Sequence, residues 1–384
     1  MKLFGLLVFL SSSVAVAVTA EQVLKTAWTD KTYLSYDEIQ ATDSKNPLRN
    51  VEGFVGHEQN GTEATEIGVK FQLKSWPEWT RGRGKTEEQK LLKNTSLGWA
   101  LQTRYNALLL FELTQQKLKC VEDAVSLSER YVKAQSLSLR AGRGTSKAFL
   151  SAKSDLYRFQ RVQSTLTQER DLLLRRILNW VPDAKEKKVE SMDLIQVEDI
   201  STALQEHFHD GDSLSKKIIH EEIEQMGQEL AIVKGREQQW VKALELSQKK
   251  KKDADAQYEV ELVIQIPILG SDVLAKQKQN ELILKRALKQ KELEESGDQL
   301  QNLRTQILNL IEIYRSAKKM ERITVGTLDS LTNMDRKIAQ RQEQLDLLNQ
   351  QQEITMLYLN YLLESETLTK NPDKNYIDKK QKEI

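Results

Sequence analysis

The chain has 384 residues, of which 29% are charged, 39% hydrophobic and 6% aromatic, and its 57 basic and 56 acidic residues leave a net charge of +1. This balance gives no overall field for a nucleic-acid partner, so none is expected. The single cysteine, Cys120, excludes an intrachain disulfide and is interpreted as a small helix residue. The few aromatic residues favour extended helices that share a narrow seam over a compact globular core.

Residues 1–20 are predicted to be a secretory signal peptide. An apolar run follows Lys2, and the small residues Val18 and Ala20 precede a cut that we expect after Ala20. A retained membrane anchor is the alternative, but serines interrupt the run and it is short for a bilayer span. No later apolar run is long enough for a transmembrane helix. The mature chain is then expected to begin with a short segment, 21–49.

The first structural repeat is predicted at 50–182 and opens with a β-hairpin at 51–74. Asn60-Gly61 supplies the turn. In the second strand, apolar side chains alternate with glycine or polar residues, so they share one face of an extended chain. These apolar residues are Ile67, Val69, Phe71 and Leu73.

Two long helices complete this repeat, one over about 86–141 and a returning one at 147–181. No proline interrupts residues 78 to 181, and proline breaks helix interiors. Two series of residues spaced by seven predict a coiled-coil seam. Mostly large side chains stand at 97, 104, 111, 118, 125, 132 and 139, and mostly smaller ones at 100, 107, 114, 121, 128 and 135.

The turn between these helices is a candidate partner-docking surface. Glycines are expected to end the first helix, and Thr145 or Ser146 to cap the second. Arg143 is available for carboxylates on a partner. The residues assigned to this turn are Gly142, Arg143, Gly144, Thr145 and Ser146.

After a linker predicted at 183–212, the second half of the chain repeats the order of the first. An ungapped alignment with an offset of 181 places a second docking turn around Arg322, Thr324 and Gly326. The second repeat, at 213–368, is predicted to contain a helix at 213–238, a hairpin at 239–268, a long helix over about 272–322 and a returning helix at 328–366. A polar C-terminal tail is predicted at 369–384.

The second hairpin contains the most apolar strand, "YEVELVIQIPILG" at 258–270. Its apolar side chains fall on one face: Tyr258, Val260, Leu262, Ile264 and Ile266. Strands of about nine to eleven residues with one apolar face match the lipid-facing wall of a membrane β-barrel. An ordinary hairpin packed on a helix is the alternative. The occurrence of such strands at matching points of the two repeats favours contact with the membrane.

Closure of such a barrel requires several chains. Four strands leave two open edges, which lipid does not tolerate. Two chains would supply eight strands and three would supply twelve. The connecting segment "KKKKDADAQ", 249–257, is then expected to face outward beside anionic headgroups, although a solvated turn is an equal alternative.

The order of elements resembles the TolC-like outer membrane efflux protein family. The resemblance is carried by "YEVELVIQIPILGSDVLAKQKQNELILKRA" (258–287) and "LRAGRGTSKAFLSAKSDLYRFQ" (139–160). It implies a homotrimeric α/β-barrel channel in the outer membrane with a periplasmic extension, docked on a periplasmic adaptor and an inner-membrane transporter. The sequence departs from the family at Lys147, where an aspartate is common, and in its short segment before the first hairpin.

The predicted fold is therefore mainly α with a small β part, arranged as two repeats of a hairpin and long coiled-coil helices. No enzyme, cofactor or metal site is expected. His207 and His209, near Asp210 and Asp212, lie in the predicted linker without a further ligand cluster, and no phosphate-binding or nucleophile motif occurs. A soluble periplasmic coiled-coil adaptor or structural spacer is the alternative function.

Overall fold

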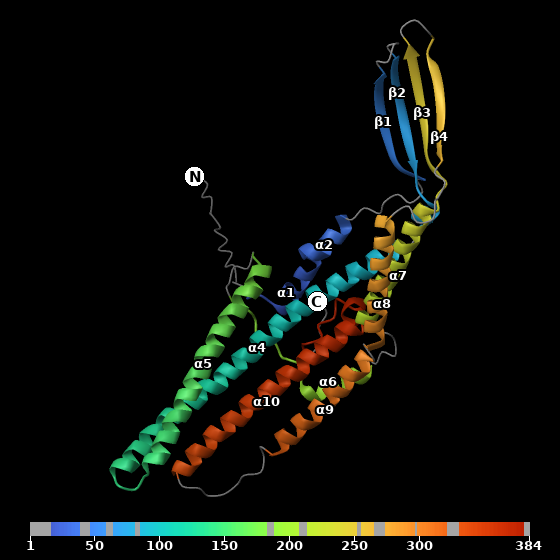
Figure 1. Cartoon of the computed structure of the whole chain (residues 1–384). Helices are drawn as coiled ribbons and strands as arrows, with labels where there is room; N and C mark the ends of the chain where they lie inside the picture. Colours follow the sequence, from blue (N-terminus) through green and yellow to red (C-terminus); the bar gives the residue numbers. More distant parts are fainter. Residues whose placement is uncertain are drawn as a thin grey trace, which may run out of the picture. The chain divides into compact units, whose positions relative to one another are not determined.

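The computed structural model describes residues 17–38, 47–58, 64–80, 85–182, 188–206, 213–251, 255–264, 273–295, 298–320 and 330–379. They form two compact units, divided at about residues 34, 94, 211 and 298. The described part is mainly helical, with four strands in one antiparallel sheet (Figure 1). This is the predicted fold class.

The helical unit contains most of the long helices. α4 and α2 cross the boundary between the units, and α3, α7 and α8 lie in the other unit. The elements of the helical unit are α1 (Ala20–Lys25), the 3-10 helix η1 (Thr26–Thr29), α2 (Lys31–Glu38), α4 (Lys85–Arg140), α5 (Ser146–Trp180), α6 (Val197–Glu206), α9 (Gln299–Met320), α10 (Ser330–Glu364) and α11 (Thr367–Lys370).

The heptad seam predicted for the first long helix is buried along α4. In the larger series Leu97, Phe111 and Leu118 are buried. In the smaller series every member is buried, from Ala100 to Gln135. Leu118 belongs to a cluster that also contains side chains of α5 and α10. Small residues between large ones let these helices approach closely along α4.

Arg104 occupies a seam position and is 3% exposed. Its guanidinium donates to Thr26 Oγ1 at 2.7 Å and to Asp30 Oδ2 at 3.1 Å, and lies 5.0 Å from the centroid of the Trp180 ring. A buried charge requires such partners. Arg104 therefore ties the N-terminal segment, which the sequence left without regular structure, to α4 and α5.

The sheet unit joins the two hairpins. Pairing of β2 with β3 brings the first half of the chain against the second, in the order β1-β2-β3-β4 (Figure 1). α7 packs against α8, and α3 against α7. The elements are β1 (Leu48–Glu58), β2 (Ala64–Leu73), α3 (Trp76–Thr80), α7 (Leu214–Glu237), β3 (Val241–Lys251), β4 (Gln257–Ile264) and α8 (Val273–Glu295).

The long helix predicted over 272–322 is instead two helices, α8 and α9. The sequence between them is Ser296-Gly297-Asp298, and glycine and aspartate are poor helix formers. The boundary between the two units falls at the same point. The heptad pattern continues across these residues, which is why the periodicity predicted one helix.

Part of the predicted linker is helical. α6 begins at Val197 and buries Ile200 and Leu204, which lie on one face because they are four residues apart. The predicted polar tail also packs as far as residue 379. Ile377 is fully buried, and its carbonyl accepts from the Ile195 N–H at 2.9 Å. Both segments are too short for periodicity to reveal them.

β3 extends into the connecting segment predicted at 249–257. It runs to Lys251, so Lys249 and Lys250 lie in the sheet, opposite Glu66 and Thr65. The connection to β4 is correspondingly shorter than the 249–257 segment expected from the sequence.

Candidate channel surfaces

One face of the sheet is apolar and exposed. Cross-strand partners share a face, so the register groups side chains into rows that cross all four strands. Tyr258 is 81% exposed, Val55 74% and Val260 67%. The apolar rows are Val51, Phe71, Leu244 and Leu262; Gly53, Val69, Leu246 and Val260; and Val55, Ile67, Gln248 and Tyr258.

The predicted lipid-facing residues fall on this face where they are described. Ile67, Val69 and Phe71 alternate along β2, and Leu73 continues the alternation. Tyr258, Val260 and Leu262 do so along β4, and Ile264 follows them at 58% exposure. Ile266 lies outside the described residues.

The opposite face of the sheet is polar. One row contains Glu52, Lys70, Glu245 and Glu261, with Lys70 ion-paired to Glu245. Glu52 Oε1 also accepts from Gln72 Nε2 at 2.9 Å. Three carboxylates and one ammonium therefore cross the sheet at one level, as suits a face in contact with water rather than lipid.

Phe54 covers Gly68 on the polar face. The two residues are cross-strand partners, and a Cβ at Gly68 would lie 2.5 Å from Phe54 Cζ. A side chain at residue 68 would displace the ring, so the glycine is required by this close approach.

A carboxylate at the base of the sheet joins three elements. Glu78 Oε2 in α3 accepts from Arg49 Nη2 of β1 at 2.7 Å and from the Ser75 N–H at 2.9 Å. Glu78 Oε1 accepts from Arg236, near the end of α7, at 2.9 Å. Burial by itself would raise the pKa of Glu78, but the hydrogen bonds from Arg236, Arg49 and Ser75 lower it to about 2. The ionised carboxylate therefore anchors the strands to two helices.

The predicted α4–α5 turn is closed by its own backbone. The N–H groups of Arg143 and Gly144 donate to the Ser138 carbonyl at 2.9 and 3.1 Å. Gly142 has φ +71°, which favours glycine, and Thr145 Oγ1 accepts from the Ala148 N–H at 3.2 Å, so Thr145 is the cap. The turn is therefore a fixed surface on which Arg143 is exposed.

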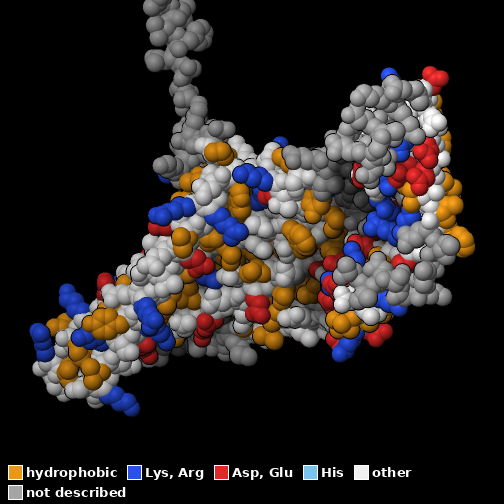
Figure 2. All heavy atoms as spheres, turned by 45° about the horizontal axis from the view of Figure 1, so that its top comes forward, with side chains coloured by type: hydrophobic (Ala, Val, Ile, Leu, Met, Phe, Trp, Pro, Cys, Tyr) orange, Lys and Arg blue, Asp and Glu red, His pale blue; other side chains and the backbone are white. Residues whose placement is uncertain are grey.

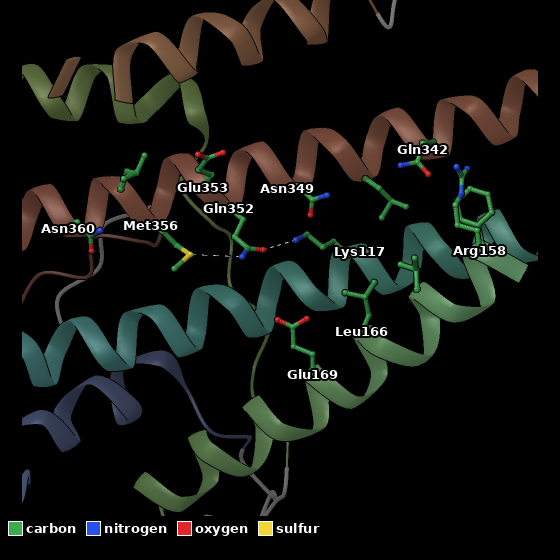
Figure 3. A pocket seen from close by; sticks show the side chains of 14 residues that line it. Lys117, Arg158, Leu166, Glu169, Gln342, Asn349, Gln352, Glu353, Met356 and Asn360 are labelled. Carbon is green, nitrogen blue, oxygen red and sulfur yellow. Dashed lines mark hydrogen bonds between the residues drawn. The ribbon is translucent and has the colours of Figure 1, made fainter. Parts of the chain in front are cut away.

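A groove of about 710 Å³ in the helical unit is lined by α4, α5 and α10 (Figure 3). Lys117 of α4 is 8% exposed, and its Nζ donates to Gln352 Oε1 at 2.6 Å. Burial lowers the pKa of Lys117, while Glu169 of α5 opposes that shift. The Lys117 ammonium is thus buried against a neutral amide and not against a carboxylate. Burial of a charge without a counter-charge costs stability.

The remaining predicted site residues lie outside the part of the chain that the structure describes: Arg322, Thr324 and Gly326, and His207, His209, Asp210 and Asp212. Across the part of the chain that the structure describes, no group of three or more His, Cys, Asp or Glu side chains could hold a metal ion. Cys120 is buried, and burial raises the pKa of its thiol, which suits a packing role.

The described helices include none that is long and apolar enough to span a bilayer.

Neither a family model nor a curated protein matches the sequence, but solved structures match the fold. The outer membrane protein VceC of Vibrio cholerae is 11% identical, with a TM-score of 0.56 over 89% of this chain and 95% of that chain. CusC is 12% identical, with a TM-score of 0.55 over 90% and 91%. The outer-membrane channel OprN is 13% identical, with a TM-score of 0.56 over 90% and 89%.

These matches extend over nearly the whole of both chains. The chain therefore has the fold of these membrane proteins, and the TolC-like fold that its sequence resembles is confirmed. At this identity the likeness concerns the fold, and what the protein does must be argued from its own surfaces.

Sequence reasoning missed two of these features. The Glu78 cluster joins residues 158 positions apart in the sequence, and Lys117 reaches Gln352 across 235 positions. A charged residue at a heptad position, such as Arg104, indicates a buried polar contact from the sequence alone. Glu78 belongs to no such repeating pattern, so the sequence does not indicate its contacts.

Proposed function

We propose that this chain is the outer-membrane channel subunit of a tripartite efflux or type I secretion system. The observation that carries the proposal is the four-stranded sheet, which has one exposed apolar face, one polar face and two unpaired edges. An exposed apolar surface of this kind marks a contact with lipid or protein.

Homotrimerisation provides the closure that the edges require. Among the described strands β1 and β4 each pair on one side only, and an open edge is not stable in lipid. Three copies would form a twelve-stranded barrel, with the apolar rows toward outer-membrane lipid and the Glu52 row toward an aqueous lumen. A passive conduit of this kind performs no chemistry and needs no cofactor.

The helical unit would extend the conduit through the periplasm. In this arrangement the α4–α5 turn, and the turn predicted around Gly326, dock on a periplasmic adaptor bound to an inner-membrane transporter, which supplies the energy. The fixed geometry of the α4–α5 turn supports its assignment as a docking surface.

Two measurements on the same preparation test the proposal. The protein is released from the outer-membrane fraction with detergent, its protein mass is determined, and the purified species is added to a planar lipid bilayer. We expect three chain masses and stepwise conductance. A monomer or dimer recovered without detergent would overturn the proposal and favour the soluble adaptor or spacer.

A further inference from the structure

The end of the α4–α5 hairpin is strongly basic. Residues 133–161, called here the basic tip, contain seven basic side chains and one acidic one. All seven basic residues are exposed: Lys133, Arg140, Arg143, Lys147, Lys153, Arg158 and Arg161. Asp155 lies 3.6 Å from Arg158, so its charge is already paired. The tip therefore presents a surplus of cations in a chain whose total charge is close to zero.

Apolar side chains lie among these cations in a helical pattern. Along α5, exposed residues at alternating spacings of three and four form a stripe: Lys147, Leu150, Ser154, Tyr157 and Arg161. Leu150 is 61% exposed and Tyr157 is 58% exposed. This spacing is that of a coiled-coil seam, so the stripe has the form of a seam without its second helix. Figure 2 shows Lys and Arg side chains beside hydrophobic ones at this end of the hairpin.

We propose that the basic tip binds the acidic end of a helical hairpin in a periplasmic partner protein. Leu150 and Tyr157 would pack against apolar residues of a partner helix, while Lys147 and Arg161 would meet Asp or Glu side chains flanking that seam. The inference rests on the proposed function and specifies the charge of the adaptor that docks at this turn. Lys147 stands where the resembled family commonly has an aspartate. An acidic turn would select a basic partner, whereas this basic turn is expected to select an acidic one.

The pattern fits a helix better than an anionic bilayer. Interfacial binding requires a continuous apolar face that enters the acyl boundary. On α5 each apolar residue of the stripe is instead flanked by a cation or serine, as in a seam that contacts one helix.

The described end of α9 carries Arg315, Lys318 and Lys319 beside Glu312, and Lys318 pairs with Glu198 of α6. Like charges across an interface are unfavourable, so this end of a second copy does not complement the basic tip.

Binding of defined probes to the detergent-purified full chain tests the inference. The probes are a synthetic antiparallel helical hairpin with glutamates flanking leucines at its turn, the same hairpin with lysines in place of the glutamates, and vesicles of equal parts phosphatidylcholine and phosphatidylglycerol. We expect the acidic hairpin to bind, salt to weaken it, and Lys147→Glu/Arg161→Glu to weaken it roughly tenfold or more.

The matched control is Lys119→Glu/Arg175→Glu, which reverses one exposed lysine of α4 and one exposed arginine of α5 outside the tip. Its affinity for the acidic hairpin should equal that of the unchanged chain. Equal binding of both hairpins, or binding of the vesicles alone, would overturn the inference. Conductance in planar bilayers reports the proposed function separately, because Lys147→Glu/Arg161→Glu should leave it intact. A chain without conductance fails the proposed function, whereas a conducting chain without a preference between the hairpins fails only this inference.

Discussion

A single carboxylate at the foot of the sheet makes the stability of the protein depend on acidity. Glu78 has a pKa of about 2 in the folded chain against an ordinary value of 4.5. A depressed folded pKa contributes stability that is complete above the unfolded value and is lost as the pH falls through the folded value. We therefore expect the free energy of unfolding to decrease between about pH 5 and pH 2, by at most on the order of 3 kcal/mol. Urea unfolding at pH 7, 4 and 3 measures this loss.

Glu78→Gln is the control, because it keeps the shape of the side chain and cannot titrate. Its unfolding free energy should be lower at pH 7, since Arg49 and Arg236 lose the negative charge that they share, and should vary less below pH 5. If both proteins lose the same stability on acidification, the pH dependence belongs to other carboxylates.

Lys117 shows the reverse situation, a cation held where burial disfavours it. Its pKa is lowered, so at neutral pH the folded state carries a cost that a neutral side chain of similar length would not. Replacement of a buried charged group by a packed apolar one is often neutral or stabilising. We expect Lys117→Met to raise the melting temperature by a few degrees, measured by circular dichroism. Marked destabilisation would mean that the contact with Gln352 contributes more than it costs. Lys119→Met, at an exposed site on the same helix, is the control.

The mature N-terminus can be predicted from contacts of residues at the expected cleavage site. The Val18 N–H donates to the Lys188 carbonyl at 2.9 Å, Val18 is 1% exposed, and Thr19 caps α1. A cut after Ala20 would remove all of these contacts. Ala15 and Ala17 also satisfy the small-residue rule for cleavage, so these contacts favour a mature chain that begins at Val18 over the cut after Ala20 that the sequence alone predicts. Mass spectrometry of the exported protein decides this, and a terminus at Glu21 would contradict it.

At the scale of elements, the two faces of β4 give a direct comparison. Leu262→Arg/Ile264→Arg places charges on the apolar face, where each costs about 2 to 4 kcal/mol at the bilayer midplane. Glu259→Arg/Glu261→Arg places the same number on the polar face of the same strand. We expect the first variant to be lost from the outer-membrane fraction and the second to assemble, as measured by immunoblotting of separated membranes. Equal assembly of both would show that the apolar face does not contact lipid.

The sequence predicted those elements whose patterns are long. The α4 seam repeats over six heptads and the strands alternate over eight or more residues, so periodicity identified both. It failed over 272–322, where the apolar pattern continues from α8 into α9 although these are separate helices, and at α6, which is too short to show a period. The Glu78 cluster could not be predicted, because the pairing of its carboxylate with Arg49 and Arg236 depends on where the sheet and α7 meet.

At the scale of the whole molecule, the unpaired edges determine how many copies assemble. If β1 of one copy pairs with β4 of the next, a cysteine on the apolar face of β1 can reach one on the same face of β4, because adjacent strands bring opposed residues within disulfide distance. Gly53→Cys suits β1, since a Cβ there meets nothing within 4 Å. On β4 the second cysteine is scanned over Tyr258, Val260 and Leu262, with Cys120→Ser removing the native thiol.

A closed ring of copies and an open row of copies differ in the largest disulfide-linked species that oxidation can produce. Twelve strands from three copies predict that, at one register, oxidation in the membrane gives linked species up to three chains and none larger on a non-reducing gel. Cysteine at Glu261, on the opposite face of β4, should give no linked species at any register. Products that end at two chains would indicate an eight-stranded barrel, and a ladder beyond three would indicate edge pairing without closure. Either result would overturn the proposal of a trimeric channel, because a conduit through the bilayer requires every strand edge to be paired within one ring.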